Sequence, residues 1–172
     1  FIWIHRPMMQ VAASLKRLFE NVPERQQTWH FWPESSHNAK ARCWYAVHQR
    51  EFPTGINPKR AFPGGEISFL AEYWLESNRA VAEYLATLPA HRWIEIREEK
   101  LAQDPETQIA QCIAFLEQPL EIPSGTCQKV DRSRNEQWKS LLSDKERNSL
   151  KDFAAAQKTE IDRIGLSSGG RC

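Results

Sequence analysis

The sequence predicts an α/β domain with a partly parallel sheet, because two apolar segments of strand length are each followed by amphipathic helices. The elements alternate in the order strand, helix, helix, strand, helix, helix, which is typical of α/β domains. The chain has 172 residues, and a chain of this length usually forms one domain with its own core. We therefore expect residues 1–172 to form a single domain.

The first strand is predicted at Phe1–Ile4, which is wholly apolar. A strand of this composition is typical of a sheet interior, so we expect it to be buried, with further sequence of the same domain upstream. A helix is predicted over Gln10–Val22, because apolar residues recur there at helical spacing. Its expected apolar stripe consists of Val11, Leu15, Leu18, Phe19 and Val22.

Residues 23–65 are rich in proline, histidine and aromatic residues and show no clear period. A loop of this length in a compact domain is usually functional, and one helix is predicted within it at Ala39–His48. The aromatic residues there fit either a local core or a pocket for an acceptor substrate: Trp29, Phe31, Trp32, Trp44 and Tyr45. Four potential metal ligands have spacings that match no short zinc motif, so no metal site is predicted: His30, His37, Cys43 and His48.

The second half begins with a long helix predicted over Glu66–Leu88 and followed by Pro89. Its expected apolar side consists of Phe69, Leu70, Tyr73, Trp74, Val81, Tyr84 and Leu88. A second strand is predicted over Arg92–Arg97. A further helix begins at Asp104-Pro105, with the aspartate as N-cap, and its expected stripe is Ile109, Cys112, Ile113 and Leu116. The last helix is predicted from the capping box of Ser143 and Glu146 to Gly165.

The overall charge is nearly balanced, with 23 Lys and Arg residues against 22 Asp and Glu and a net charge of +1. This balance argues against a nucleic-acid partner, since nonspecific nucleic-acid binders are strongly basic. No apolar run approaches the ~20 residues that a transmembrane helix needs, so we expect no membrane segment in this chain. The four cysteines form no C-x-x-C pair and are too few for a disulfide scaffold, which favours the cytoplasm.

Two groups of polar residues are candidates for an anion-binding site. Arg6 follows the first strand and Ser14 lies on the helix after it; ligands of open α/β sheets bind beyond the carboxyl ends of the strands. A guanidinium fork and a hydroxyl suit phosphate or sulfate. In the second group, Arg132 and Arg134 precede Trp138 in a basic stretch over residues 129–139. Each group also fits ordinary solvated side chains.

The same segments resemble the PAPS-dependent sulfotransferases, in which PAPS is 3′-phosphoadenosine 5′-phosphosulfate. Arg6 to Ser14, with Val11 between them, is similar to the family's R-(D/N)-P-x-x-V-x-x-S segment after a strand. Arg97-Glu98-Glu99-Lys100-Leu101 with Asp104-Pro105 resembles R-Y-E-D-L…D-P, and Arg132-Ser133-Arg134 through Trp138 to Leu142-Ser143 resembles the late S-R…W…L-S segment. The three segments occur in the family's order.

The resemblance implies a sulfotransferase-like (P-loop NTPase-like) domain without its N-terminal part. It implies PAPS as co-substrate, with Arg6 and Ser14 on the 3′-phosphate and Arg132 and Arg134 closing over the same nucleotide. The sulfuryl group would pass to a hydroxyl or amine of a small molecule, glycan or peptide, in the cytoplasm or, in a eukaryote, the Golgi lumen.

The chain departs from the family pattern in several places. Pro7 stands where the family has Asp or Asn, Met8 where it has Pro, and Glu98 where it has Tyr. The phosphosulfate loop P-x-S-G-T/S and the catalytic His or Glu would lie upstream of Phe1, so no residue here is assigned as catalytic. A P-loop kinase-like phosphoryl transferase and a non-catalytic nucleotide-binding remnant are the alternatives.

Overall fold

The fold is described from a computed structural model, which describes residues 1–20, 66–117, 119–121, 125, 127 and 130–166, without the side chains of Phe19, Arg132 and Arg134. The helix predicted at Ala39–His48, the four potential metal ligands and the aromatic group of residues 29–45 lie outside the described residues.

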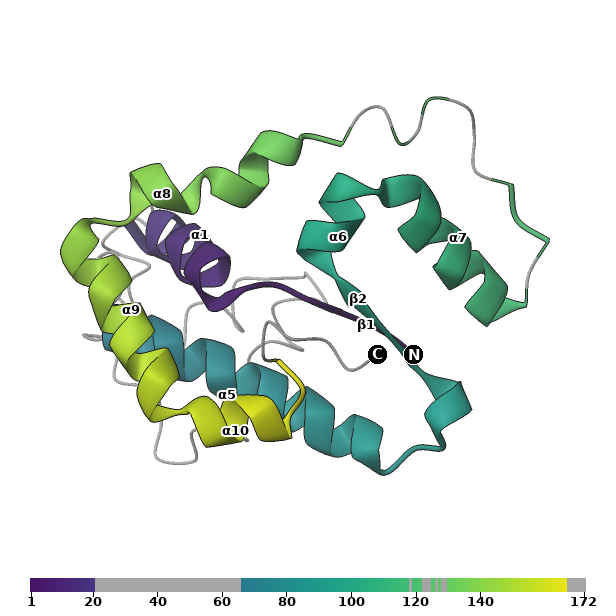
Figure 1. Cartoon of the computed structure of the whole chain (residues 1–172), viewed down its shortest axis with the longest axis horizontal. Helices are drawn as coiled ribbons and strands as arrows, with labels where there is room; N and C mark the ends of the chain where they lie inside the picture. The colour runs from purple at the N-terminus through teal and green to yellow at the C-terminus, as the bar shows by residue number, and fades with distance from the viewer. Residues whose placement is uncertain (21–65, 118, 122–124, 126, 128–129, 167–172) are drawn as a thin grey trace, which may run out of the picture.

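The described residues form an α/β arrangement that is mostly helical. The elements in order are β1 (Ile2–His5), α1 (Met8–Glu20), α5 (Ile67–Ala86), the 3-10 turn η2 (Ala90–Arg92), β2 (Ile94–Arg97), α6 (Glu98–Gln103), α7 (Pro105–Leu116), η4 (Arg132–Glu136), α8 (Trp138–Leu141), α9 (Asp144–Ala156) and α10 (Lys158–Arg163). Figure 1 shows β1 and β2 side by side, with α8 alongside α1. The α/β class and the parallel pairing are therefore confirmed.

The two strands pair in parallel, with Ile2 opposite Ile94 and His5 opposite Arg97. The prediction that the first strand is buried is wrong for most of its length, because Ile4 is 54% exposed whereas Ile96 beside it is 1% exposed. Helices α6 and α7 contact β2 and leave β1 largely uncovered, so only His5 of β1 is buried.

Helix α1 begins at Met8, two residues earlier than predicted, and residues 21–22 of the predicted helix lie outside the described part. Its expected stripe is confirmed in part, since Val11 and Leu15 are partly buried against the core. The fully buried residues are Ala12 and Ala13, whereas Leu18 is 46% exposed. Helix α1 packs against α5, and Ala12 and Ala13 belong to the same core cluster as the first half of α5.

Helix α5 matches the predicted range to within two residues at each end. Its first half is buried, including Phe69, Leu70 and Trp74. The expectation that Val81 and Tyr84 belong to the buried side is wrong, since both are exposed. The core cluster contains residues from the first half of α5, from α1 and from α9.

The C-terminal segment predicted as one helix forms two, α9 and α10, with the break at Gln157. The capping box is confirmed: the Ser143 hydroxyl accepts from the Glu146 main-chain N–H, and the Glu146 carboxylate accepts from the Ser143 N–H. The end at Gly165 is also confirmed. Its φ of 80° and the bonds from the Gly165 and Leu166 N–H groups to Asp162 and Ile161 carbonyls form a Schellman motif.

Helix α7 begins as predicted, since the Asp104 side chain accepts from the Thr107 N–H and Pro105 occupies the first turn. Its expected stripe is only half-buried, and Leu116 is exposed. The short helix α6, between β2 and α7, is not predicted from the sequence.

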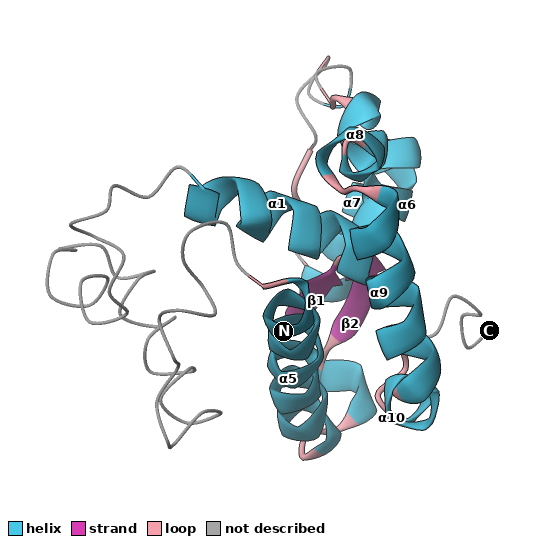
Figure 2. Cartoon of the chain, turned by 90° about the vertical axis from the view of Figure 1, so that its left-hand side faces the viewer, coloured by secondary structure: helices cyan, strands magenta, loops and turns pink. Residues whose placement is uncertain are grey.

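The main core lies where α1, α5 and α9 meet, and Phe69, Leu70 and Leu150 are fully buried there. Figure 2, turned by 90°, shows α1 above α5, with α9 to the right of both. No helix in the described ranges is both long and apolar enough to span a bilayer.

Candidate functional site

Arg6 lies directly after the carboxyl end of β1, in the turn that leads into α1. Its main-chain carbonyl accepts a 2.8 Å hydrogen bond from the indole N–H of Trp74, a buried residue of α5. The carbonyl of Pro7 accepts from the N–H groups of Gln10 and Val11, both at 3.1 Å. The turn is thus attached to the core on one side and to the first turn of α1 on the other.

Arg6 and Ser14 line the same hollow, of about 320 Å³, which we call the α1 hollow. Gln10, Ser14 and Arg17 face it from α1, at a spacing of four and then three residues that places them on one side of a helix. Trp138 and Leu141 of α8 form the opposite wall. The predicted juxtaposition of Arg6 and Ser14 is observed, and their role in binding stays a prediction.

The charge of the α1 hollow favours an anion. Two arginines line it, and no acidic side chain is among the described residues that do so. Gln10 is 6% exposed, and its Oε1 is buried without a hydrogen-bond partner in the described structure. A side-chain amide presents both donors and an acceptor, so this group can meet a polar ligand.

Arg6 lies close to the carboxylate of Glu98, the first residue of α6. Arg6 Nε lies 3.3 Å from Glu98 Oε2, yet neither atom has a hydrogen bond with acceptable geometry. The pair is therefore an ion pair with poor alignment. Because the Arg6 side chain is 37% exposed, part of the guanidinium can still be reached by a ligand.

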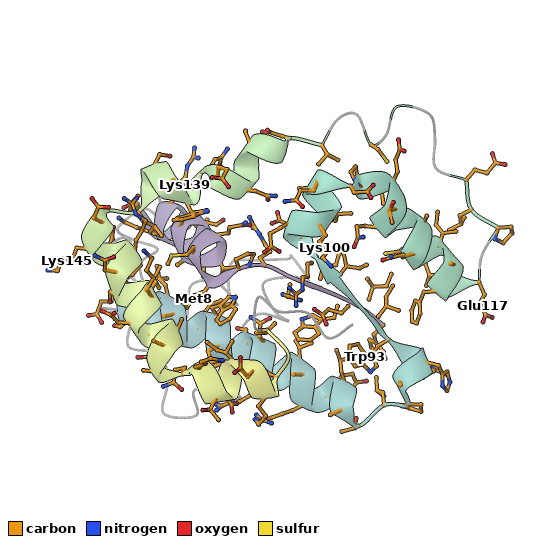
Figure 3. The ribbon with its side chains drawn as sticks, in the orientation of Figure 1. Met8, Trp93, Lys100, Glu117, Lys139 and Lys145 are labelled. Carbon is orange, nitrogen blue, oxygen red and sulfur yellow. The ribbon has the colours of Figure 1, made fainter. Side chains whose placement is uncertain are left out.

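The late basic segment reaches the α1 hollow through Trp138. Its η4 turn contacts both α6 and α8, and the Asp131 carboxylate holds the turn by accepting from the N–H and hydroxyl of Ser133 at 3.1 and 2.6 Å. The side chains of Arg132 and Arg134 lie outside the described part, so their approach to Arg6 stays a prediction. Lys139, labelled in Figure 3, lies 5.7 Å from the ring centre of Trp138.

Polar contacts that join α9 to α1 and to the end of α8 hold α8 in place against α1. Lys16 of α1 donates to Glu146 of α9 at 2.8 Å, and Arg147 donates to the carbonyls of Lys139 and Leu142 at 2.7 and 2.6 Å. Partial burial acts to raise the pKa of Glu146, but the hydrogen bonds from Lys16 and Ser143 and the charge of Lys16 together lower it. The wall that carries Trp138 is thus held by charged groups.

A second hollow, of about 330 Å³, lies beyond the carboxyl ends of both strands, and we call it the strand-end hollow. His5 lines it, and its Nε2 is 2.7 Å from Glu95 Oε1; Arg97 Nε approaches the same oxygen at 3.3 Å. Arg6 lines this hollow as well as the α1 hollow. Sequence reasoning missed His5 and Gln10, although His5 adjoins Arg6 and Gln10 shares the helix face of Ser14.

No group of three or more potential metal-binding side chains occurs in the part of the chain that the structure describes. Cys112 and Cys127 are free thiols. Comparison with protein-family models, with curated proteins and with solved structures finds no match to this chain.

Proposed function

We propose that the α1 hollow binds the 3′-phosphate of a phosphoadenosine nucleotide, and that the chain is the nucleotide-binding part of a sulfotransferase-like, P-loop NTPase-like domain. In the sulfotransferase reaction, PAPS transfers its sulfuryl group to a hydroxyl or amine acceptor and leaves as 3′-phosphoadenosine 5′-phosphate (PAP). The observation that carries the proposal is the convergence of Arg6, Ser14 and Arg17 on one hollow beside the end of a parallel strand.

The chemistry of these side chains supports a phosphate ligand. A guanidinium offers two parallel N–H donors that match phosphate oxygens, and the bond is strengthened by charge. A serine hydroxyl adds a neutral donor, and the amide of Gln10 can meet the sugar or the base. We assign Arg132 and Arg134 of the η4 turn to the same nucleotide, because their segment resembles the family's late basic segment.

The protein's own contribution to transfer is the fixed placement of the nucleotide. The main chain of Arg6 is held by Trp74, so the backbone from which the guanidinium would reach the phosphate is already ordered. We further propose a reducing compartment, the cytoplasm, because Cys112 and Cys127 are both free thiols. The acceptor in this proposal is a small molecule, a glycan or a peptide.

Calorimetric titration with PAP and with AMP, which lacks the 3′-phosphate, tests the proposal. We expect PAP to bind more tightly than AMP, and Arg6→Ala to weaken PAP binding by about ten- to a hundredfold while leaving AMP binding nearly unchanged. Ser14→Ala should weaken PAP binding by about two- to tenfold. Arg6→Lys should keep only part of the PAP affinity, because a point charge cannot form the bidentate contact.

Matched controls separate the site from general charge and helix effects. Arg92→Ala removes an exposed arginine from η2, and Ser149→Ala removes an exposed serine from the middle of α9; both should leave the PAP affinity unchanged. Equal binding of PAP and AMP by the wild type, or an unchanged PAP affinity in Arg6→Ala, overturns the proposal.

A further inference from the structure

Two consecutive residues at the start of α9 attach this helix to both walls of the α1 hollow. Glu146 binds the α1 wall, because its Oε1 accepts a 2.8 Å hydrogen bond from Lys16 Nζ. Arg147 binds the α8 wall, because its Nη1 donates to the main-chain carbonyls of Lys139 and Leu142 at 2.7 and 2.6 Å. Figure 1 shows α9 starting where α8 ends, with α1 beside α8. The first turn of α9 therefore joins the two helices that line the hollow from opposite sides.

Helix α8 is too short to keep its position unaided. It has four residues, Trp138–Leu141, and an isolated helix of this length is unstable in water. The carbonyl groups at the end of a helix lack partners within the helix, and Arg147 supplies the donors for two carbonyls at this end of α8. Hydrogen bonds from a charged donor are stronger than those from a neutral donor, and the Arg147 side chain is only 24% exposed. Arg147 therefore fixes α8, together with the packing of Leu142, which is 2% exposed.

The position of α8 determines the shape of the α1 hollow. Trp138 and Leu141 line the hollow from α8, while Arg6 and Ser14 line it from the side of α1. The η4 turn immediately precedes α8 and contacts it, so a shift of α8 would also move the late basic segment. Loss of the Arg147 contacts would therefore change the hollow, although Arg147 does not line it.

We propose that the first turn of α9 (residues 144–147) sets the spacing between α1 and α8, and that Glu146 and Arg147 are positioning residues for the nucleotide. Neither side chain touches the nucleotide: Arg147 acts through α8, and Glu146 acts through Lys16. The inference rests on the proposed function, because the nucleotide is the ligand whose affinity these residues control. The placement of α8 needs no ligand and is measured without one.

Calorimetric titration with PAP measures the contribution of Arg147. Arg147→Met keeps the apolar stem of the side chain but removes every donor, and we expect PAP to bind about two- to thirtyfold more weakly. Arg147→Lys keeps the charge but lacks the planar fork, which here uses one nitrogen for the two carbonyls and the other for Asp144. It should therefore keep only part of the PAP affinity, and it serves if Arg147→Met fails to fold.

Arg79 of α5 provides the matched control. Like Arg147, it pairs with an acidic residue three positions earlier on its own helix, Glu76 for Arg79 and Asp144 for Arg147. Arg79 does not line the α1 hollow. Arg79→Met removes the same charge and an equivalent ion pair, so it should leave the PAP affinity unchanged.

Glu146→Gln separates positioning from charge, because the two effects have opposite signs. Glutamine keeps a capping acceptor for Ser143 but loses the charge that attracts Lys16. Loss of a carboxylate would by charge alone favour an anion, whereas loss of positioning should weaken PAP binding by at least about twofold. An unchanged or tighter PAP affinity in Glu146→Gln overturns the role of Glu146.

Trp138 reports the position of α8 in the absence of nucleotide. Its indole ¹H–¹⁵N signal, measured by NMR, should shift in Arg147→Met and stay in place in Arg79→Met. In a Trp138→Ala background, Arg147→Met should change the PAP affinity less than it does in the wild type, because the wall that it positions is already lost. A purely structural role would lower the free energy of unfolding and leave both the Trp138 signal and the PAP affinity of the folded protein unchanged.

The outcomes separate this inference from the nucleotide proposal. If the wild type binds PAP, an unchanged affinity in Arg147→Met, an equal loss in Arg79→Met or full affinity in Arg147→Lys overturns the inference and leaves the proposed function standing. If the wild type does not bind PAP, the proposed function fails, and the control of nucleotide affinity fails with it. The Trp138 signal then decides the remaining part: a shift in Arg147→Met supports the placement of α8 by Arg147, and an unchanged signal overturns it.

Discussion

Glu98 puts a carboxylate where the sulfotransferase pattern has a neutral tyrosine, and replacing it by glutamine gives a sensitive test of the α1 hollow. Glu98 Oε2 lies 3.3 Å from Arg6 Nε. A phosphate oxygen hydrogen-bonded to the other side of the guanidinium would lie roughly 6 Å from that carboxylate. The carboxylate would therefore repel a bound phosphate.

The size of this effect follows from Coulomb's law. A dianion at that distance is repelled by roughly 1.4 kcal/mol in a medium with the dielectric constant of water, which corresponds to about a tenfold change in affinity; salt reduces it. Loss of the ion pair also frees Arg6, but a partly exposed and poorly aligned pair contributes about 0.2–1 kcal/mol. The repulsion outweighs the loss of the ion pair by roughly 0.4–1.2 kcal/mol, so Glu98→Gln should tighten PAP binding by about two- to eightfold.

Calorimetric titration with PAP at two salt concentrations measures the change, and the gain in affinity should shrink at the higher salt. Glu106→Gln, which removes an exposed carboxylate from the first turn of α7, changes the net charge equally and should leave the affinity nearly unchanged. Weaker PAP binding in Glu98→Gln would refute the reasoning, because it would mean that Glu98 helps the site by orienting Arg6. An equal gain in Glu106→Gln would mean that only the total charge matters.

Two further predictions concern stability. Leu150→Ala should lower the free energy of unfolding, measured in urea, by about 2–5 kcal/mol, because Leu150 is 1% exposed. Leu120→Ala, at a 56% exposed position, should change the free energy of unfolding by less than about 0.5 kcal/mol. Similar losses in both variants would contradict the assigned core. The pKa of Glu146 is lower in the folded state than in the unfolded chain. The ionised carboxylate therefore stabilises the fold above about pH 4.3, the ordinary glutamate value. This stabilisation is lost as the pH falls below that value. The stability difference between wild type and Glu146→Gln, from urea melts at several pH values, should therefore be largest near neutral pH and shrink in acid; a pH-independent difference would contradict the assigned pairing with Lys16.

Local sequence signals predicted the parts of this fold whose ends are fixed by local chemistry. The caps at Asp104 and Ser143 and the stop at Gly165 are each satisfied within one turn of their own helix, so the sequence around them is sufficient. The parallel pairing of the two strands also follows from their order along the chain. These features depend little on what else packs nearby.

Burial was predicted less well, because it depends on which neighbours the fold supplies. The apolar character of Ile4 predicted a covered strand, but α6 and α7 contact β2 rather than β1. Leu18 has the right spacing for a buried stripe, yet the contact between α1 and α5 uses the alanines of α1 instead. A helical period identifies an apolar face without showing which part of it another element covers.

The candidate site was predicted in part for the same reason. Arg6 and Ser14 were identified from their positions after a strand, and they do line one hollow. Gln10 and Arg17 share the α1 face of Ser14 and could have been found from the helical spacing alone. His5 and Glu99 could not be identified from local sequence. Their place in the strand-end hollow depends on the pairing of β1 with β2 and on α10 lying across the strand ends.

The two hollows that meet at Arg6 differ in their acidic lining, and part of this difference comes from α6. Helix α6 begins immediately after β2, so Glu98 and Glu99 are carried to the strand ends together. Glu98 approaches Arg6, and Glu99 lines the strand-end hollow without lining the α1 hollow. The acidic side chains that line either hollow, Glu99 and Asp162, therefore lie on one side of Arg6, while the described lining on the other side carries arginines and no acid. An anion therefore suits the α1 hollow better than the strand-end hollow, and the α1 hollow is the side of Arg6 on which we propose that the 3′-phosphate binds.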